Sequence, residues 1–167
     1  MTASKNRIGI AIIGLLLSAR LTMAAEGEPT TMNSLVSVNL SVHSSATNRC
    51  KLMVVFTNIT DGSLRIFRND LPWESRHSVM LIAVRAGAGN AILSEDLPVD
   101  DPIIGDVQII KNQKLQGTID LEKRFPDLIH TLEKADVILF WSYQLTPIEK
   151  SSLPRQGGWL LIPKLHQ

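Results

Sequence analysis

The chain lacks most of the features that mark the common chemical classes of protein. It holds a single cysteine, Cys50, among 167 residues, so no internal disulfide can form and the core must be held by packing. Basic residues form no stripe or cluster in the body of the chain, which argues against a nucleic-acid binder. The longest apolar run, residues 8–19, is shorter than the roughly 20 residues that a membrane-spanning helix needs.

Motifs of catalysis and metal binding are equally scarce. The sequence contains neither His-Glu-x-x-His nor Gly-x-Ser-x-Gly, which are the helical zinc motif and the nucleophile elbow. Its four histidines, at positions 43, 77, 130 and 166, have none of the close spacings of a local metal site. We therefore predict no catalytic, cofactor-binding or metal-binding residue, and a protein that is not an enzyme.

An acidic segment over residues 94–106 is the best metal candidate that remains, because hard cations such as calcium prefer carboxylate ligands. Its carboxylates belong to Glu95, Asp96, Asp100, Asp101 and Asp106. Their spacing matches no EF-hand loop, and two prolines stiffen the segment. We interpret it as a solvated, irregular connection.

The N-terminus has the layout of a cleaved secretory signal peptide. Lys5 and Arg7 precede the apolar run, and the small residues Ala24 and Ala25 follow it. We predict a leader over residues 1–24, with cleavage after Ala25 as the alternative. The protein is then secreted or periplasmic, with no stable membrane anchor after cleavage. Removing the leader takes away three basic residues and no acidic ones, so the formal net charge falls from +1 to −2.

The rest of the chain is typical of short strands separated by turns. Residues 36–42 alternate apolar and polar side chains, as a half-buried strand does, whereas residues 50–57 are apolar on both faces and belong in the centre of a sheet. Further strands are predicted over 63–68, 78–85, 107–110, 115–121, 135–145 and 159–162. Asp61-Gly62 and residues 111–114 are expected to close hairpins, and residues 126–134 to form one short helix.

These elements predict a single all-β domain over residues 34–165. About seven to eight short strands, with turns near every tenth residue and no alternating helices, indicate an antiparallel β-sandwich. Cys50 lies in step with Leu52, Val54 and Phe56, so we interpret it as a buried core thiol, with a reactive or dimer-forming thiol as the alternative.

Several stretches also carry a family resemblance. They are residues 36–42, residues 53–58 with the turn and Leu64 that follow, residues 117–121, residues 125–126 and residues 141–143. Together they resemble the immunoglobulin-like β-sandwich that precedes the catalytic domain of deuterolysin-type metalloproteases and also occurs as a free-standing secreted domain. The resemblance implies an immunoglobulin-like fold and an accessory role. It transfers no catalytic residue, because the zinc motif of those proteases is absent.

Three residues are candidates for contact with a partner: Leu71, Trp73 and Trp159. Leu71 and Trp73 lie in a predicted loop with Pro72, and Trp159 follows two glycines. Tryptophans near loops anchor interfaces, and in sandwiches they also plug the ends of the core. Both roles stay open here, with packing favoured for the two tryptophans.

We expect a non-enzymatic exported domain that recognises a protein or peptide partner through its loops or an exposed sheet edge. A secreted protease is one candidate partner. Two alternatives remain open. One is a structural or assembly subunit of the envelope, and the other is a hydrolase whose residues, His77 among them, come together from distant loops.

Overall fold

The computed structural model describes residues 36–43, 50–87, 89, 91–96, 104–149 and 151–165. The predicted leader, the first two residues of the predicted domain and residues 44–49 lie outside the described residues. In chain order the elements are β1 (Val36–His43), β2 (Lys51–Asn58), β3 (Leu64–Phe67), the 3-10 helix η1 (Arg68–Asp70), β4 (Val79–Arg85), β5 (Asp106–Ile109), β6 (Lys114–Asp120), α1 (Leu121–Arg124), α2 (Leu128–Leu132), β7 (Val137–Tyr143) and β8 (Gln156–Ile162).

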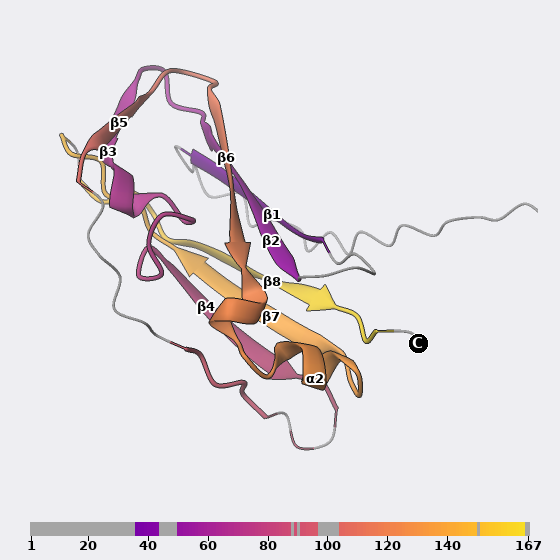
Figure 1. Ribbon diagram of the computed structural model, residues 1–167. Coiled ribbons are helices and arrows are strands. Elements are labelled where there is room, and N and C mark those ends of the chain that lie inside the picture. Colours follow the sequence, from indigo (N-terminus) through magenta and orange to yellow (C-terminus); the bar gives the residue numbers. More distant parts are fainter. Residues whose placement is uncertain are drawn as a thin grey trace, which may run out of the picture.

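The strands pair in three small antiparallel sheets. Two have three strands, in the orders β1-β2-β6 and β4-β7-β8, and the third is a β3–β5 ribbon. In Figure 1 this ribbon lies at one end of the molecule and α2 at the other. The prediction of a mostly β, antiparallel fold is confirmed. The central place of β2 is confirmed too, because a strand that is apolar on both faces suits the middle of a sheet.

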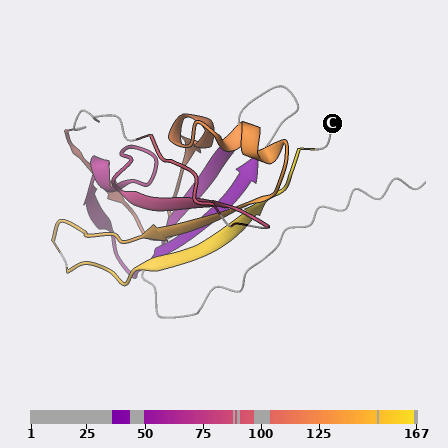
Figure 2. The same cartoon turned by 90° about the horizontal axis from the view of Figure 1, so that it is seen from below.

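The two three-stranded sheets contribute side chains to one core. Figures 1 and 2 show the backbones of these sheets in two views related by a 90° turn. Phe56 of β2 and Tyr143 of β7 are both almost fully buried. Their rings meet edge to face with centroids 6.5 Å apart, a favoured aromatic geometry. At another side of the core, Gln156 Nε2 of β8 donates a hydrogen bond of 2.7 Å to the carbonyl oxygen of Val36 in β1.

Both predicted hairpins are wrong. β2 pairs with β6 rather than β3, and β3 pairs with β5 rather than β2. The two chain segments that pair as β2 and β6 therefore bend at a corner at the end of that sheet. Beyond the corner they pair again as β3 and β5. Gly62 does not adopt the positive φ that a type I′ hairpin turn needs at Asp-Gly, so the chain turns away from β2 instead of folding back on it.

The side chain of Asn58 holds this corner. It is fully buried, and all of its polar atoms have partners. Its Nδ2 donates to the carbonyl oxygens of Gly62 and Ile109 at 2.8 and 2.9 Å. Its Oδ1 accepts from the backbone nitrogen and the hydroxyl of Thr60 at 2.9 and 2.7 Å. One amide thus joins both chain segments of the corner and satisfies groups that burial would otherwise leave unpaired.

The backbone of Asn58 completes the junction. Its nitrogen donates to the carbonyl oxygen of Gln113 at 3.1 Å, and its carbonyl oxygen accepts from the nitrogen of Asn112 at 2.8 Å. Asn112 has a φ of 62°, a left-handed conformation that asparagine adopts more readily than most residues. The turn predicted at 111–114 therefore exists, but it connects β5 and β6, which belong to different sheets and do not pair with each other.

The helices differ from the prediction in number and length. The helix expected over residues 126–134 is present as the shorter α2. The helical turn α1 was not predicted, because strand character was expected to run to Leu121. Asp120 ends that strand, since its carboxylate caps α1 by accepting from the backbone nitrogen of Lys123 at 3.2 Å. No helix in the described part of the chain has the length and apolar character to cross a membrane.

Cys50 lies in the core with 2 % of its surface exposed, so the prediction of a buried thiol is confirmed. Burial raises the pKa of this thiol to about 11, and the nearby carboxylates of Glu122 and Asp120 add to the rise. The reactive thiolate is therefore disfavoured in the folded protein.

We predict that Cys50 resists thiol reagents at pH 8 in the folded protein, because it is both buried and protonated. Reaction with a chromogenic disulfide should be slower than in the unfolded chain by on the order of 100-fold or more. The same reagent added in denaturing urea should titrate one thiol per chain at once. Rapid labelling of the native protein would contradict the assignment.

We predict that Asn58→Ala destabilises the fold by about 3 kcal/mol, because it leaves several buried polar groups of the corner without partners. The free energy of unfolding is measured by urea titration. Asn39→Ala is the matched control: Asn39 is an exposed asparagine of β1 that donates one hydrogen bond to Ser37, so its loss should change stability by less than about 0.5 kcal/mol. Equal effects of the two substitutions would contradict the role given to Asn58.

Candidate docking surface

The outward face of the β4-β7-β8 sheet is apolar. Strand register places its side chains in three rows across the sheet. The rows are Met80, Ser142 and Gly157; Ile82, Phe140 and Trp159; and Val84, Ile138 and Leu161. The apolar members of these rows form what we call the outer apolar face, with Phe140 at its centre on the central strand. None of them carries a charge.

The side chains of the outer apolar face are accessible to solvent. The exposed fractions are 56 % for Met80, 40 % for Ile82, 43 % for Phe140, 50 % for Trp159 and 44 % for Leu161. At about 200 Å² for a large apolar side chain, these fractions amount to roughly 450 Å² of exposed apolar surface. Continuous patches of this size on a soluble domain mark interaction sites more often than scattered apolar residues do.

The other three-stranded sheet provides an internal comparison, because its outward face has the same three-by-three arrangement. Its rows are Ser37, Thr57 and Lys114; Asn39, Val55 and Gln116; and Ser41, Met53 and Thr118. Most of these side chains are polar, and Gln116 Nε2 donates a hydrogen bond to the Met53 sulfur at 3.1 Å. One sheet thus has an ordinary solvated face, whereas the other exposes apolar side chains in the same geometry.

A polar rim borders the outer apolar face beside Ser142. Arg155 donates to Ser142 Oγ through Nη1 and to Gln144 Oε1 through Nη2, each at 3.0 Å. These bonds tie the loop before β8 to the central strand β7. Apolar side chains at the centre with polar groups at the margin are the usual composition of a protein–protein interface.

The sequence contains a signal for this face. Residues 79–84, 137–141 and 159–162 are apolar at nearly every position, a pattern expected of strands that are buried on both faces. In the structure each of these strands buries one face in the core and leaves the other open. The second face is as apolar as a buried surface, but no segment among the described residues covers it.

The three predicted contact residues lie in different environments. Leu71 is 3 % exposed and belongs to the core, which leaves little of its surface for a partner. Trp159 is half exposed on β8 and lies in the outer apolar face. The structure therefore does not support the core-packing role that was favoured for it. Trp73 is half-buried and packs against the core at its margin.

Gly117 of β6 makes room for Trp73. A β-carbon built on Gly117 would lie 2.0 Å from Cδ2 and 2.1 Å from Cγ of the indole, far inside van der Waals contact. The indole therefore lies directly on the backbone of β6, in the place that a side chain would fill. This contact explains why the loop after η1 lies against the inner side of β6.

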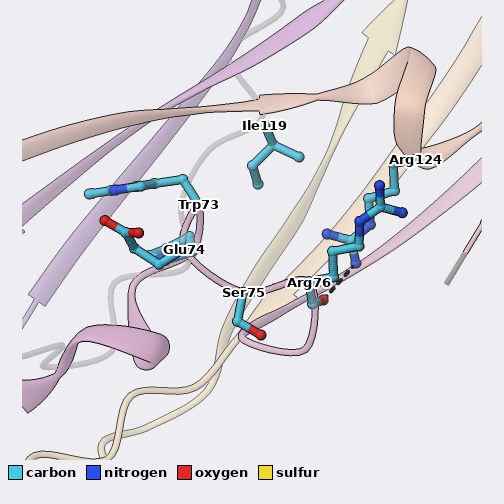
Figure 3. Close-up of a pocket in the computed structure, with 7 residues that line it drawn as sticks. Trp73, Glu74, Ser75, Arg76, Ile119 and Arg124 are labelled. Carbon is cyan, nitrogen blue, oxygen red and sulfur yellow. Dashed lines mark hydrogen bonds between the residues drawn. The ribbon is translucent and has the colours of Figure 1, made fainter. Parts of the chain in front are cut away.

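A small pocket lies beside Trp73 (Figure 3). It is lined by Pro72, Trp73, Glu74, Ser75, Arg76, Ile119 and Arg124, and its volume is about 200 Å³. Pockets that bind small molecules are usually about 300–1,000 Å³. This pocket is therefore too small to be preferred over the outer apolar face as the functional site.

Arg124, at the wall of this pocket, has a structural role. It is 3 % exposed, and its Nε donates to the carboxylate of Glu95. Its Nη2 donates to the carbonyl oxygens of Arg76 and Val79 at 3.1 and 2.8 Å. Burying a guanidinium is tolerated when a carboxylate and other acceptors surround it in this way. The side chain thereby fastens α1 to the start of β4.

The acidic segment is engaged in ion pairs at both of its ends. Glu95 pairs with Arg124, and Asp106 pairs with Arg65, whose guanidinium lowers the pKa of the Asp106 carboxyl. Asp100 and Asp101 lie outside the described residues. Among the residues that are described, no three His, Cys, Asp or Glu side chains gather closely enough to hold a metal ion.

Comparisons with known proteins add no relative to this picture. No protein-family model matches the chain, and no curated protein sequence matches it. The function is therefore inferred from the geometry of the outer apolar face.

We predict that Gly117→Ala destabilises the fold by about 3 kcal/mol, because the new methyl group overlaps the Trp73 indole and must displace it. Urea titration gives the free energy of unfolding. Gly62→Ala is the matched control, since a β-carbon there meets no atom within 4 Å. In the Trp73→Leu background, Gly117→Ala should cost at least about 1 kcal/mol less. An unchanged cost would mean that the two residues do not compete for the same space.

Proposed function

We propose that this protein is an exported, non-enzymatic binding domain that docks a protein partner on the outer apolar face. One observation carries the proposal. Of two sheet faces with the same arrangement, one is polar, and the other exposes five large apolar side chains, each at least 40 % accessible. Covering an apolar surface of this extent with another molecule is favourable, and the largest apolar patch of a domain is often functional.

The position of the surface favours protein binding over catalysis. Flat apolar faces give large contact areas but no enclosed space in which water is excluded from a reacting group. The surface also differs from the sequence-based expectation of loops or a sheet edge. A sheet face buries side chains, whereas an edge would bind chiefly through backbone hydrogen bonds.

The family resemblance is compatible with this role. We propose an immunoglobulin-like β-sandwich, and the contribution of both three-stranded sheets to one core supports it. Accessory domains of this kind act by contact with other proteins, and a secreted protease is a partner that the resemblance suggests. The layout of residues 1–24 supports export.

We predict that a photo-crosslinking residue placed at position 159 gives a discrete adduct in the cells that make the protein. The reason is that Trp159 lies in the middle row of the outer apolar face. Position 116 is the matched control, because Gln116 holds the corresponding middle-row place on an edge strand of the polar face. The adducts are detected by their mass after denaturing electrophoresis.

Competition makes the result specific for the face. Purified Val55→Gln protein, altered at the centre of the polar face, should suppress the adduct at position 159. Phe140→Gln protein, altered at the centre of the outer apolar face, should not. Equal crosslinking at positions 116 and 159, or no adduct at either, would be incompatible with the proposed function.

A further inference from the structure

We infer that the molecule covering the outer apolar face is a second copy of this chain, packed face to face about a two-fold axis. This inference rests on the proposed function, since both use the same surface. It goes further because it identifies the partner. Three properties of the surface support it: its charge, its symmetry and its area.

Charge allows two copies of the face to meet. A face with one sign of charge would repel its own copy, and a face chosen for a charged partner would carry the complementary charges. No residue of the outer apolar face is charged. Charged side chains lie beside the face at both ends of β7: Asp136, two residues before Ile138, accepts from the backbone nitrogen of Lys164 at 2.7 Å, and the Arg155 guanidinium is bonded to Ser142 and Gln144 at the rim.

The arrangement of the face suits a two-fold interface. In such an interface the same patch serves both copies, so it must be complementary to itself. Phe140 is central, with apolar neighbours on both adjacent strands: Ile82 on β4 and Trp159 on β8. A two-fold axis in the interface beside Phe140 brings the two rings together and lays apolar side chains on apolar side chains. Sheets pack face to face in this manner at about 10 Å separation.

The area is sufficient for a stable pair. A standard interface buries about 800 Å² on each partner, of which somewhat more than half is apolar. The roughly 450 Å² of exposed apolar side chain on this face matches that apolar share. The polar rim and the adjoining backbone supply the remainder. Gly157 is paired with Ser142 and has no side chain, so nothing larger than a hydrogen atom projects from the sheet at that corner of the face.

The test is sedimentation equilibrium of the full chain, expressed with its native N-terminus and purified as the host processes it. We expect a dimer to dominate within about 1–100 μM. Phe140→Gln should weaken self-association on the order of 100-fold, because a two-fold interface loses the central side chain twice. Phe140→Leu should retain most of the association. Val55→Gln, the equivalent change on the polar face, should leave the dissociation constant within about 3-fold.

Two further measurements separate this dimer from other associations. Since the face is uncharged, the dissociation constant should not rise when the salt concentration increases. Met80→Gln, at the most exposed position of the face, should also weaken the dimer, and its thermal unfolding should match that of the unaltered protein. If Phe140→Gln impairs folding, the Met80 variant alone decides the matter.

The outcomes distinguish the dimer from the broader proposal. A protein that stays monomeric throughout the concentration range overturns the dimer. An adduct at position 159 with a different protein would then leave the proposed function standing, whereas binding to vesicles of zwitterionic lipid would replace both with a membrane surface. A dimer that Val55→Gln disrupts as strongly as Phe140→Gln also overturns the inference, because association would not use the outer apolar face.

Discussion

The buried amide of Asn58 is the interaction on which the arrangement of the chain depends. Its hydrogen bonds join the end of β2 to the segment between β5 and β6. At this point the chain passes from one sheet to another twice, once between β2 and β3 and once between β5 and β6. The β3–β5 ribbon then covers one end of the core with Leu64, Ile66 and Ile109, each almost fully buried. The chain after β3 is thereby directed through η1, where the Tyr143 hydroxyl donates to the carbonyl oxygen of Asp70 at 2.8 Å. The loop that follows brings Trp73 onto β6. A polar group in the core is normally a liability, but here every one of its atoms is satisfied and it specifies a single connection.

Local patterns in the sequence were sufficient for the strands but not for their pairing. Alternation of polar and apolar residues identified β1, and apolar character on both faces identified β2 as a central strand. The pairing of β3 with β5 could not be read in this way. Asp61-Gly62 is a strong local hairpin signal, yet the conformation of that turn is decided by Asn58, Thr60 and the distant Ile109. Contacts between residues 51 positions apart have no signature in a single sequence.

The sequence carries only an ambiguous signal for the candidate surface, for a different physical reason. A strand that is apolar on both faces has the same composition whether its second face is covered by its own chain or by another molecule. Trp159 illustrates the ambiguity, because packing at the end of the core was favoured for it and half of its surface is exposed. The contrast between two sheet faces becomes visible only when register assigns each side chain to a face. The function is therefore inferred from the three-dimensional pairing of the strands and not from any motif.

The corner at Asn58 also has a consequence for chemical modification of the chain before it folds. Asn58-Ile59-Thr60 has the form of an acceptor site for N-linked sugar, and both side chains that a glycosylating enzyme would engage are internal in the finished fold. Sugar attached to Asn58 Nδ2 would replace one of its two hydrogens, so that this nitrogen could no longer donate to both Gly62 and Ile109, and would force a bulky polar group into the core. In a compartment that glycosylates exported proteins, folding of this corner and modification of the nascent chain are therefore competing events, and a chain modified first cannot close the junction between its sheets.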